Sequence, residues 1–211
     1  MTFRLLQLAD SAFPTGGFAH SAGLEAAVQL GEVPDVAGFL EEALWHAACA
    51  VLPFVRKVHG APERLAEVDS RAEAFLLSHV SRRASRAQGR ALVATAARAF
   101  PELGAIAGWE AQVRSGGLRE HVGPITGAVC AAVGLGEGET LAMALHTTAR
   151  GLLSAAVRLG KLGPLEAQRL HARLPMEALV AAVPEEPVST APLHEVFGAV
   201  HDRLYARLFQ S

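Results

Sequence analysis

Histidine is the residue type in this sequence with the most obvious potential for chemistry, because its ring commonly binds transition metals. The chain has nine histidines. None lies four residues from another, and neither HxH nor HExxH occurs. His194 and His201 are seven residues apart, about 10 Å along a helix, which is too far for both to bind one ion. The spacing predicts no metal site and no cofactor.

Signatures of nucleotide binding and of nucleophilic catalysis are equally incomplete. "RLGKLGP" at residues 158–164 contains Gly160 and Lys161, but Leu162 stands where a phosphate-binding loop requires Ser or Thr. "AHSAG" at residues 19–23 resembles a GxSxG elbow only loosely, and that elbow needs a strand before its helix. We therefore predict no catalytic residues and a protein that is not an enzyme.

Arginines form the clearest charged pattern. Arg82, Arg86 and Arg90 in "SRRASRAQGRALV" recur at every fourth residue and project from one helical face. Carboxylates on neighbouring helices that could neutralise this face are Glu41, Glu42 and Glu110. A solvated face, internal pairing and a partner-binding surface all remain open. Nucleic acid is disfavoured as a partner, because the net charge is −2 and no aromatic residues interleave with the arginines.

Composition indicates one globular domain over residues 1–211. The chain is 51% hydrophobic, so it can bury a large core. Cys49 and Cys130 are each isolated in an alanine-rich run, which is typical of small core residues. Isolated thiols of this kind indicate a reducing compartment. We find no signal-peptide pattern and no run of about 18 apolar residues, so we expect a cytoplasmic protein with no membrane partner.

Hydrophobic periodicity is helical throughout. In residues 34–59 the apolar residues recur at threes and fours, with Pro34 suited to the start and Pro53 expected to kink or split the helix. The segment 140–159 is almost free of charge, as expected at a core centre or a subunit interface. Without strand alternation, the pattern predicts an all-α, bundle-like fold of about nine helices.

The end of the sequence has an unusual organisation. "PEEPVSTAP" at residues 184–192 has the composition of an exposed linker. We predict a C-terminal amphipathic helix at 193–209 behind it, with apolar residues at Leu193, Val196, Val200, Leu204 and Leu208. Such a tail docks onto the same domain, a second subunit or another protein.

"DSAFPTGGFAHSAGLE" at residues 10–25 concentrates residues with special backbone properties. Pro14 fixes a turn, and Gly16 and Gly17 permit angles that other residues avoid. We expect Phe13 and Phe18 to anchor this corner, and His20 or Ser21 to cap the helix that carries Glu25. The corner is either purely structural or a partner-binding surface.

Four segments together resemble the urease accessory protein family UreF. They are "LLQLADSAFPTGGFAHSAGLE" at 5–25, "SRRASRAQGR" at 81–90, "LLSAAVRLGKLGPLEAQRL" at 152–170 and "HDRLYARLFQS" at 201–211. Their order matches the family, and they are distributed along essentially the whole chain, from residue 5 to residue 211. Two departures are Ala22, where family members often have glycine, and Lys161, where they often have proline.

This resemblance implies a non-catalytic chaperone of urease maturation. Members are all-α, tend to form homodimers and bind the accessory protein UreD, also called UreH. Together they recruit the GTPase UreG onto apo-urease, where the nickel site is assembled. The family is thought to regulate GTP hydrolysis by UreG, and to line a nickel route without holding the metal tightly.

The residues that we expect to bind partners come from these segments. We single out Arg207 for recruiting the GTPase, directly or by ordering the tail. The full set is Pro14, Gly16, Gly17, Phe18, Ser21, Glu25, Arg82, Arg86, Arg90, Arg158, Lys161, His201, Tyr205, Arg207, Leu208 and Phe209. The alternative is a helical ligand-binding or regulatory domain unrelated to urease, with a pocket beneath the helix at 140–159.

Overall fold

The computed structural model describes residues 3–33 and 35–211, and within them it contains helices and no strands. The all-α prediction is confirmed. The α-helices are α1 (Phe3–Ala9), α2 (Leu24–Gln29), α3 (Val36–Ala50), α4 (Leu52–Gly60), α5 (Leu65–Phe75), α6 (His79–Ala99), α7 (Gly104–Ser115), α8 (Val122–Ala132), α9 (Glu137–Arg158), α10 (Pro164–His171), α11 (Met176–Ala181) and α12 (Pro192–Val200). Short 3-10 turns are η1 (Gly17–Ala19), η2 (Pro62–Arg64) and η3 (His201–Arg203).

Local breaks divide the chain into more helices than the periodicity indicated. Pro53 does split the predicted 34–59 helix, because it lies in the first turn of α4, where its missing N–H costs nothing. Pro34 lies outside the described residues. Asp35 begins α3 as an N-cap whose carboxylate accepts the N–H groups of Ala37 and Gly38.

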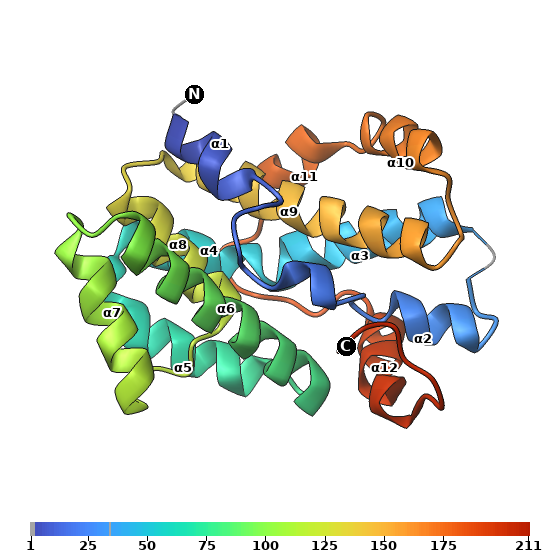
Figure 1. Ribbon diagram of the computed structural model, residues 1–211, viewed down its shortest axis with the longest axis horizontal. Helices are drawn as coiled ribbons and strands as arrows, with labels where there is room; N and C mark the ends of the chain where they lie inside the picture. Colours follow the sequence, from blue (N-terminus) through green and yellow to red (C-terminus); the bar gives the residue numbers. More distant parts are fainter. Residues whose placement is uncertain (1–2, 34) are drawn as a thin grey trace.

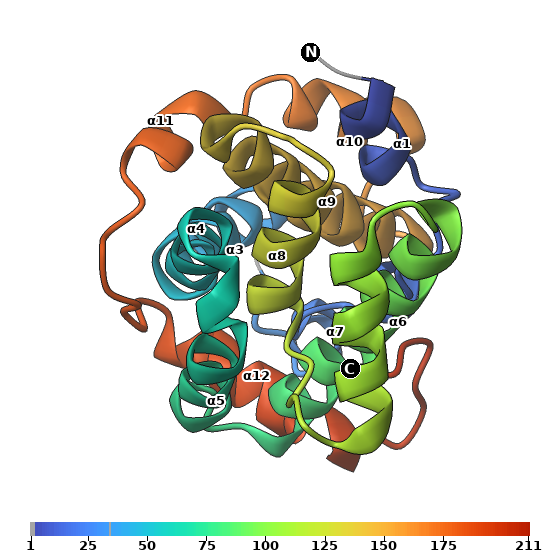
Figure 2. The same ribbon diagram turned by 90° about the vertical axis from the view of Figure 1, so that its left-hand side faces the viewer.

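Two packed regions make up the molecule (Figures 1 and 2). One region surrounds α8, which packs closely against α4 and α6 and buries an apolar core shared with α5 and α7. The other region surrounds α9, which contacts α3, α10 and α11. Of the two places expected for residues 140–159, a core centre or a subunit interface, the core accounts for much of the segment, since α9 buries Leu141, Leu145 and Leu152 among others.

Helices α4 and α8 touch backbone to backbone. Gly127 of α8 faces α4, and a Cβ added there would overlap the carbonyl oxygen of Val55. Gly89 of α6 is similarly placed against the carbonyl oxygen of Glu120. Neither position has room for a Cβ, so glycine is required at both for the backbones to approach this closely.

The segment Val36–Gly60 is long and apolar enough to cross a membrane by length and composition, but 56% of its most apolar stretch is buried inside the protein. It comprises α3 and α4, which are interrupted at Val51 and pack against α9 and α8. Core packing therefore accounts for its apolar character.

Both cysteines are free and buried, as predicted. Burial raises the pKa of the Cys130 thiol to about 12, and the hydrogen bond with the Thr140 hydroxyl offsets this only slightly. A thiol in this state is a poor nucleophile, so it acts as a small core residue.

The predicted C-terminal helix at 193–209 is wrong beyond Val200. Helix α12 ends there, η3 follows, and Leu204 adopts an extended conformation. The N–H groups of Leu208 and Phe209 donate to the side chain of Glu25 instead of to helical carbonyls. Contacts with the N-terminal segment thus replace the helical hydrogen bonds of this stretch.

Candidate functional site

The signature loop near the N-terminus and the C-terminal tail lie against each other. Both the N–H and the hydroxyl of Ser21 donate to the carbonyl oxygen of Ser211, at 2.5 and 2.9 Å. The N–H of Gln210 donates to the carbonyl oxygen of Ala19 at 2.8 Å. We call residues 18–25 and 201–211 together the tail clasp; it lies beside α2 and α12 (Figure 1).

A single buried carboxylate, that of Glu25, is at the centre of the tail clasp. It is 1% exposed and accepts hydrogen bonds from the N–H of Leu208 at 2.6 Å and that of Phe209 at 3.1 Å. The Nε2 atom of the fully buried His201 lies 2.9 Å from the same carboxylate. A buried carboxylate is costly unless such donors surround it, so Glu25 and the tail stabilise each other.

Arg158, at the end of α9, joins the two halves of the tail clasp. Its guanidinium lies 4.1 Å from the ring centroid of Phe18 and 4.2 Å from that of Phe209. It also donates a hydrogen bond to the carbonyl oxygen of Phe18 at 2.7 Å. One guanidinium thus makes cation–π contacts with a ring from each half of the tail clasp and links the two.

The corner at residues 10–25 matches only part of its prediction. Pro14 is the centre of a tight turn, in which the N–H of Thr15 donates to the carbonyl oxygen of Phe13, and Phe13 is buried. Gly16 has a φ of +74°, as predicted, whereas Gly17 has no left-handed angle and that prediction is wrong. Phe18 is 68% exposed, so it packs on Arg158 and not in the core.

The start of α2 also differs from expectation. Its N-cap is Gly23, at a φ of +87°, without a side-chain cap. The Ser21 hydroxyl accepts a long 3.4 Å hydrogen bond from the N–H of Glu25 and donates to Ser211. Ser21 therefore fixes the tail more than it caps the helix. Ala22, between Ser21 and Gly23, has a left-handed φ of +50°.

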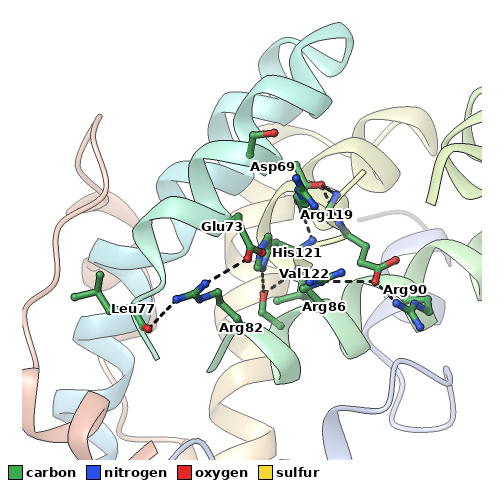
Figure 3. A network of polar contacts seen from close by, with 12 residues as sticks. Asp69, Glu73, Leu77, Arg82, Arg86, Arg90, Arg119, His121 and Val122 are labelled. Atoms are coloured by element: carbon green, nitrogen blue, oxygen red, sulfur yellow. Dashed lines mark hydrogen bonds and ion pairs between the residues drawn. The ribbon is translucent and has the colours of Figure 1, made fainter. Parts of the chain in front are cut away.

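The arginine face of α6 exists, and it pairs with carboxylates other than those predicted (Figure 3). Arg82 lies 3.5 Å from the carboxylate of Glu73, Arg86 lies 3.8 Å from that of Glu120, and Arg90 forms a close ion pair with Glu120. Two of the predicted acids are engaged elsewhere: Glu110 pairs with Arg114, and Glu42 lies near His194.

A buried network that the sequence did not reveal supports this face. Asp69 is fully buried and accepts the N–H groups of Arg119, Glu120 and His121. Burial raises the pKa of Asp69, although these hydrogen bonds oppose the shift. Three converging amides hold the segment 119–121 in place, including Glu120 at a φ of +65°.

His121 continues the network onto α6. Its Nε2 atom lies 2.8 Å from the carboxylate of Glu73, and its Nδ1 atom lies 3.1 Å from the hydroxyl of Ser85. Burial would raise the pKa of Glu73, but the His121 hydrogen bond and the nearby arginines outweigh it and lower that pKa. The Ser85 hydroxyl also accepts the N–H of Val122. Because His121, Glu73 and Ser85 all have hydrogen-bond partners, this network holds α5, α6 and the start of α8 together.

Asp202 links the arginine face to the tail. It accepts two hydrogen bonds from Arg83, at 2.7 and 2.9 Å, and lies 3.2 Å from both His79 and Arg207. The Arg83 hydrogen bonds are the main reason why its pKa is lowered to about 2. Arg207 is thus placed where the tail clasp meets α6.

The remaining predicted residues are at the surface. Tyr205 is fully exposed and Leu208 is half-exposed, both in the tail. Lys161 lies in the exposed turn between α9 and α10, and the structure shows no contact between its side chain and the tail clasp. Of the other predicted residues, Pro14, Gly16 and Gly17 lie in the loop that precedes the tail clasp, and Arg158 contacts the tail clasp from α9. The rest lie in the tail clasp or on α6.

A cavity of about 710 Å³ lies beneath α9, where the alternative interpretation placed a pocket. Helix α9 contributes Met143, Thr147 and Gly151 to its wall, and the loop from Phe13 to Gly17 covers part of it. Its size is compatible with a small molecule or with ordered water.

The family model described as UreF matches residues 32–175. The chain belongs to the UreF family. It is 36% identical to urease accessory protein F of Arabidopsis thaliana, over 97% of this chain and 90% of the relative. It is 34% identical to the protein of the same name in Oryza sativa subsp. indica, over 96% of this chain and 82% of the relative.

A bacterial UreF protein matches over an even larger share of its length. Urease accessory protein UreF of Mycobacterium sp. (strain JLS) is 33% identical, over 98% of this chain and 97% of the relative. The predicted resemblance to UreF is therefore confirmed. Membership of this family supports a role in urease maturation and disfavours the alternative of a domain unrelated to urease.

Proposed function

We propose that this UreF-family protein is a non-catalytic chaperone that bridges UreD (UreH) and the GTPase UreG on apo-urease. In this role it acts in the cytoplasm as a homodimer and regulates GTP hydrolysis by UreG while nickel, the cargo, is inserted. Relatives named urease accessory proteins, aligned over nearly the whole chain, support a scaffold of the same type.

The observation that carries the proposal is the tail clasp. Its inner residues are buried: Glu25, His201 and Phe209 fix the tail by hydrogen bonds and packing. Its outer residues face solvent, with Tyr205 fully exposed and Arg207 beside it. Aromatic and arginine side chains presented by a fixed backbone are typical of protein-binding surfaces, because little conformational freedom is lost on binding.

Helix α12 also presents apolar residues to solvent. Leu193 and Val196 are each more than half exposed, on the helix that leads into the tail. Together with Leu208 they supply the apolar contact area that a partner protein would cover. We therefore assign Tyr205, Arg207 and Leu208 to partner binding, with Arg207 contributing most to recruitment of the GTPase.

Urease activity in cells tests this proposal. In cells that carry the urease genes without this gene, and with nickel supplied, a plasmid copy should restore activity. Arg207→Ala should lose most of that rescue at normal protein levels. Arg173→Ala changes an exposed arginine away from the tail and should rescue fully.

Two outcomes would contradict the proposal. One is full urease activity in cells without the gene. The other is unchanged binding to UreD and UreG after deletion of residues 203–211, which would remove the tail from the interface.

The cavity beneath α9 favours a second candidate function, that of a ligand-binding regulatory protein. A small molecule that fills the cavity would raise the melting temperature of the isolated chain. Filling the wall with Gly151→Leu should abolish that shift. A screen without any stabilising ligand would count against this second function.

A further inference from the structure

A groove of about 390 Å³ runs along the exposed face of α6. We call it the arginine groove. Its walls are His79, Arg82, Arg83, Arg86, Ala87 and Arg90 of α6, together with Glu73 of α5. Four arginines on one face of a single helix would repel one another without the carboxylates described above.

Charges in the arginine groove are arranged in layers. The carboxylates lie deep, with side chains 3% exposed for Glu120 and about one quarter exposed for Glu73 and Asp202. The arginines lie outside them, from 39% exposed at Arg86 to 65% at Arg90. Four guanidinium groups thus face three carboxylates, and a molecule approaching from solvent meets the positive groups first.

Several arginine N–H groups remain free to bind a ligand. Arg86 lies 3.8 Å from Glu120, beyond hydrogen-bond distance, and that carboxylate is already paired with Arg90. The Nε atom of Arg82 also has no hydrogen-bond partner among the described residues, but it is buried, so the accessible donors are those of the other N–H groups. A guanidinium carries five N–H donors, so the buried carboxylates orient these side chains without saturating them.

We propose that the arginine groove binds an acidic helix of a partner protein, one with a carboxylate at every fourth residue. Arg82, Arg86 and Arg90 stand on successive turns, about 6 Å apart along the axis. An acidic helix with the same repeat places its carboxylates at the same spacing. A phosphate is compact and doubly charged, whereas these arginines form a row, with Glu73 and Glu120 beneath it.

This inference rests on the proposed function, because a scaffold requires a protein partner, and it adds the chemistry of that partner. The arginine groove adjoins the tail clasp through the contacts of Asp202 with Arg83 and Arg207. One partner could therefore cover both surfaces at once.

A binding assay on the isolated full chain tests the inference. The probe is a fluorescent peptide of repeated Glu-Ala-Ala-Ala units, about 16 residues long, a length at which alanine-rich peptides begin to form helices in water. It should bind, and binding should weaken as salt is added. A peptide with Gln in place of Glu should not bind.

Variants on α6 locate the site. Arg86→Gln should weaken peptide binding by about tenfold or more, since a charge-assisted contact is lost without exposing buried Glu120. Arg98→Gln, an exposed arginine on the same helix outside the groove, should bind as the unaltered protein does. Thermal unfolding of both variants verifies that the fold is intact.

Three outcomes would each overturn the inference. They are equal binding of the Gln peptide, an unchanged affinity of Arg86→Gln for the Glu peptide, and binding of inorganic pyrophosphate in place of the peptide. These outcomes are separate from those for urease. A protein that restores urease but does not bind the peptide overturns only the groove. A protein that binds the peptide but is dispensable for urease overturns only the proposed function.

Discussion

Ala22 has a left-handed backbone at a φ of +50°, an unfavourable conformation for a residue with a Cβ. It lies between Ser21 and Gly23, whose positions are fixed by the tail and by the start of α2. Its side chain is exposed, so no packing compensates for the strain. The resemblance to UreF indicated glycine as the common residue here, and the backbone angle supplies the physical reason.

Ala22→Gly should therefore stabilise the protein. We expect the free energy of unfolding to rise by about 0.5–1 kcal/mol, because the strain removed exceeds the added flexibility of the unfolded chain. Urea denaturation measures the change. Ala61→Gly is the control: its φ of −148° suits any residue, so that change should be neutral or destabilising.

At this scale the sequence identified the residues of the tail clasp but not their contacts. Phe18, Ser21 and Glu25 stood out by type and by family resemblance. That Glu25 accepts hydrogen bonds from Leu208 and Phe209 could not be predicted, because more than 180 residues separate them and a buried carboxylate carries no local signal.

At the scale of elements, glycine decides how closely helices approach. Gly127 allows α8 to touch the backbone of α4, whereas a Cβ at Gly108 of α7 would meet no atom within 4 Å. The two residues are both inside helices, where glycine itself is unfavourable.

Alanine should therefore have opposite effects at the two positions. Gly127→Ala should lower the free energy of unfolding by about 2 kcal/mol or more, because α4 and α8 must separate. Gly108→Ala should raise it by about 0.5–1 kcal/mol through helix propensity alone. Thermal or urea unfolding compares the stabilities of the two variants directly. An equal loss of stability at both positions would contradict the claim that close α4–α8 packing is what requires glycine at position 127.

Hydrophobic periodicity predicted helices in the body of the protein correctly, but it did not predict the structure of the tail. Leu204 and Leu208 have the spacing of a helical stripe, yet α12 ends at Val200, and the chain is irregular after the short turn η3. Tertiary hydrogen bonds to Glu25 and Ala19 satisfy its backbone instead. A local pattern cannot report such partners, so apolar spacing alone gave the wrong structure.

On the scale of the whole molecule, Asp202 connects the tail to α6. Its pKa is lowered to about 2 from an ordinary value of 3.8, mainly by the Arg83 hydrogen bonds. A carboxylate with a lowered folded-state pKa stabilises the fold above its ordinary pKa, and this stabilisation is lost as the pH falls toward the folded value.

Unfolding at several pH values tests this connection. The stability advantage of the unaltered protein over Asp202→Asn should be constant above about pH 4 and should disappear between about pH 4 and 2. Glu185→Gln, which changes an exposed carboxylate, provides the comparison. An advantage that is independent of pH over this range would contradict the role of the Asp202 charge.

Whole-molecule arrangement explains why the acids facing the arginines were predicted incorrectly. Glu73 reaches α6 from α5. Glu120 reaches it from the segment before α8, whose backbone Asp69 holds by hydrogen bonds. Charge counting along the sequence offers many candidate carboxylates and no means of choosing among them. Only the packing of α5, α6 and α8 selects these two.

Ser21 and Ser211 are 190 residues apart, and their hydrogen bonds have a consequence for the time at which the protein acquires its final shape. At about 5–20 residues per second, translation places roughly 10–40 s between the two. During that interval the carboxylate of Glu25 and the hydroxyl of Ser21 are without their partners from the tail. The first signature segment to leave the ribosome is therefore among the last to become ordered, and a chain interrupted before Phe209 would carry an open N-terminal corner.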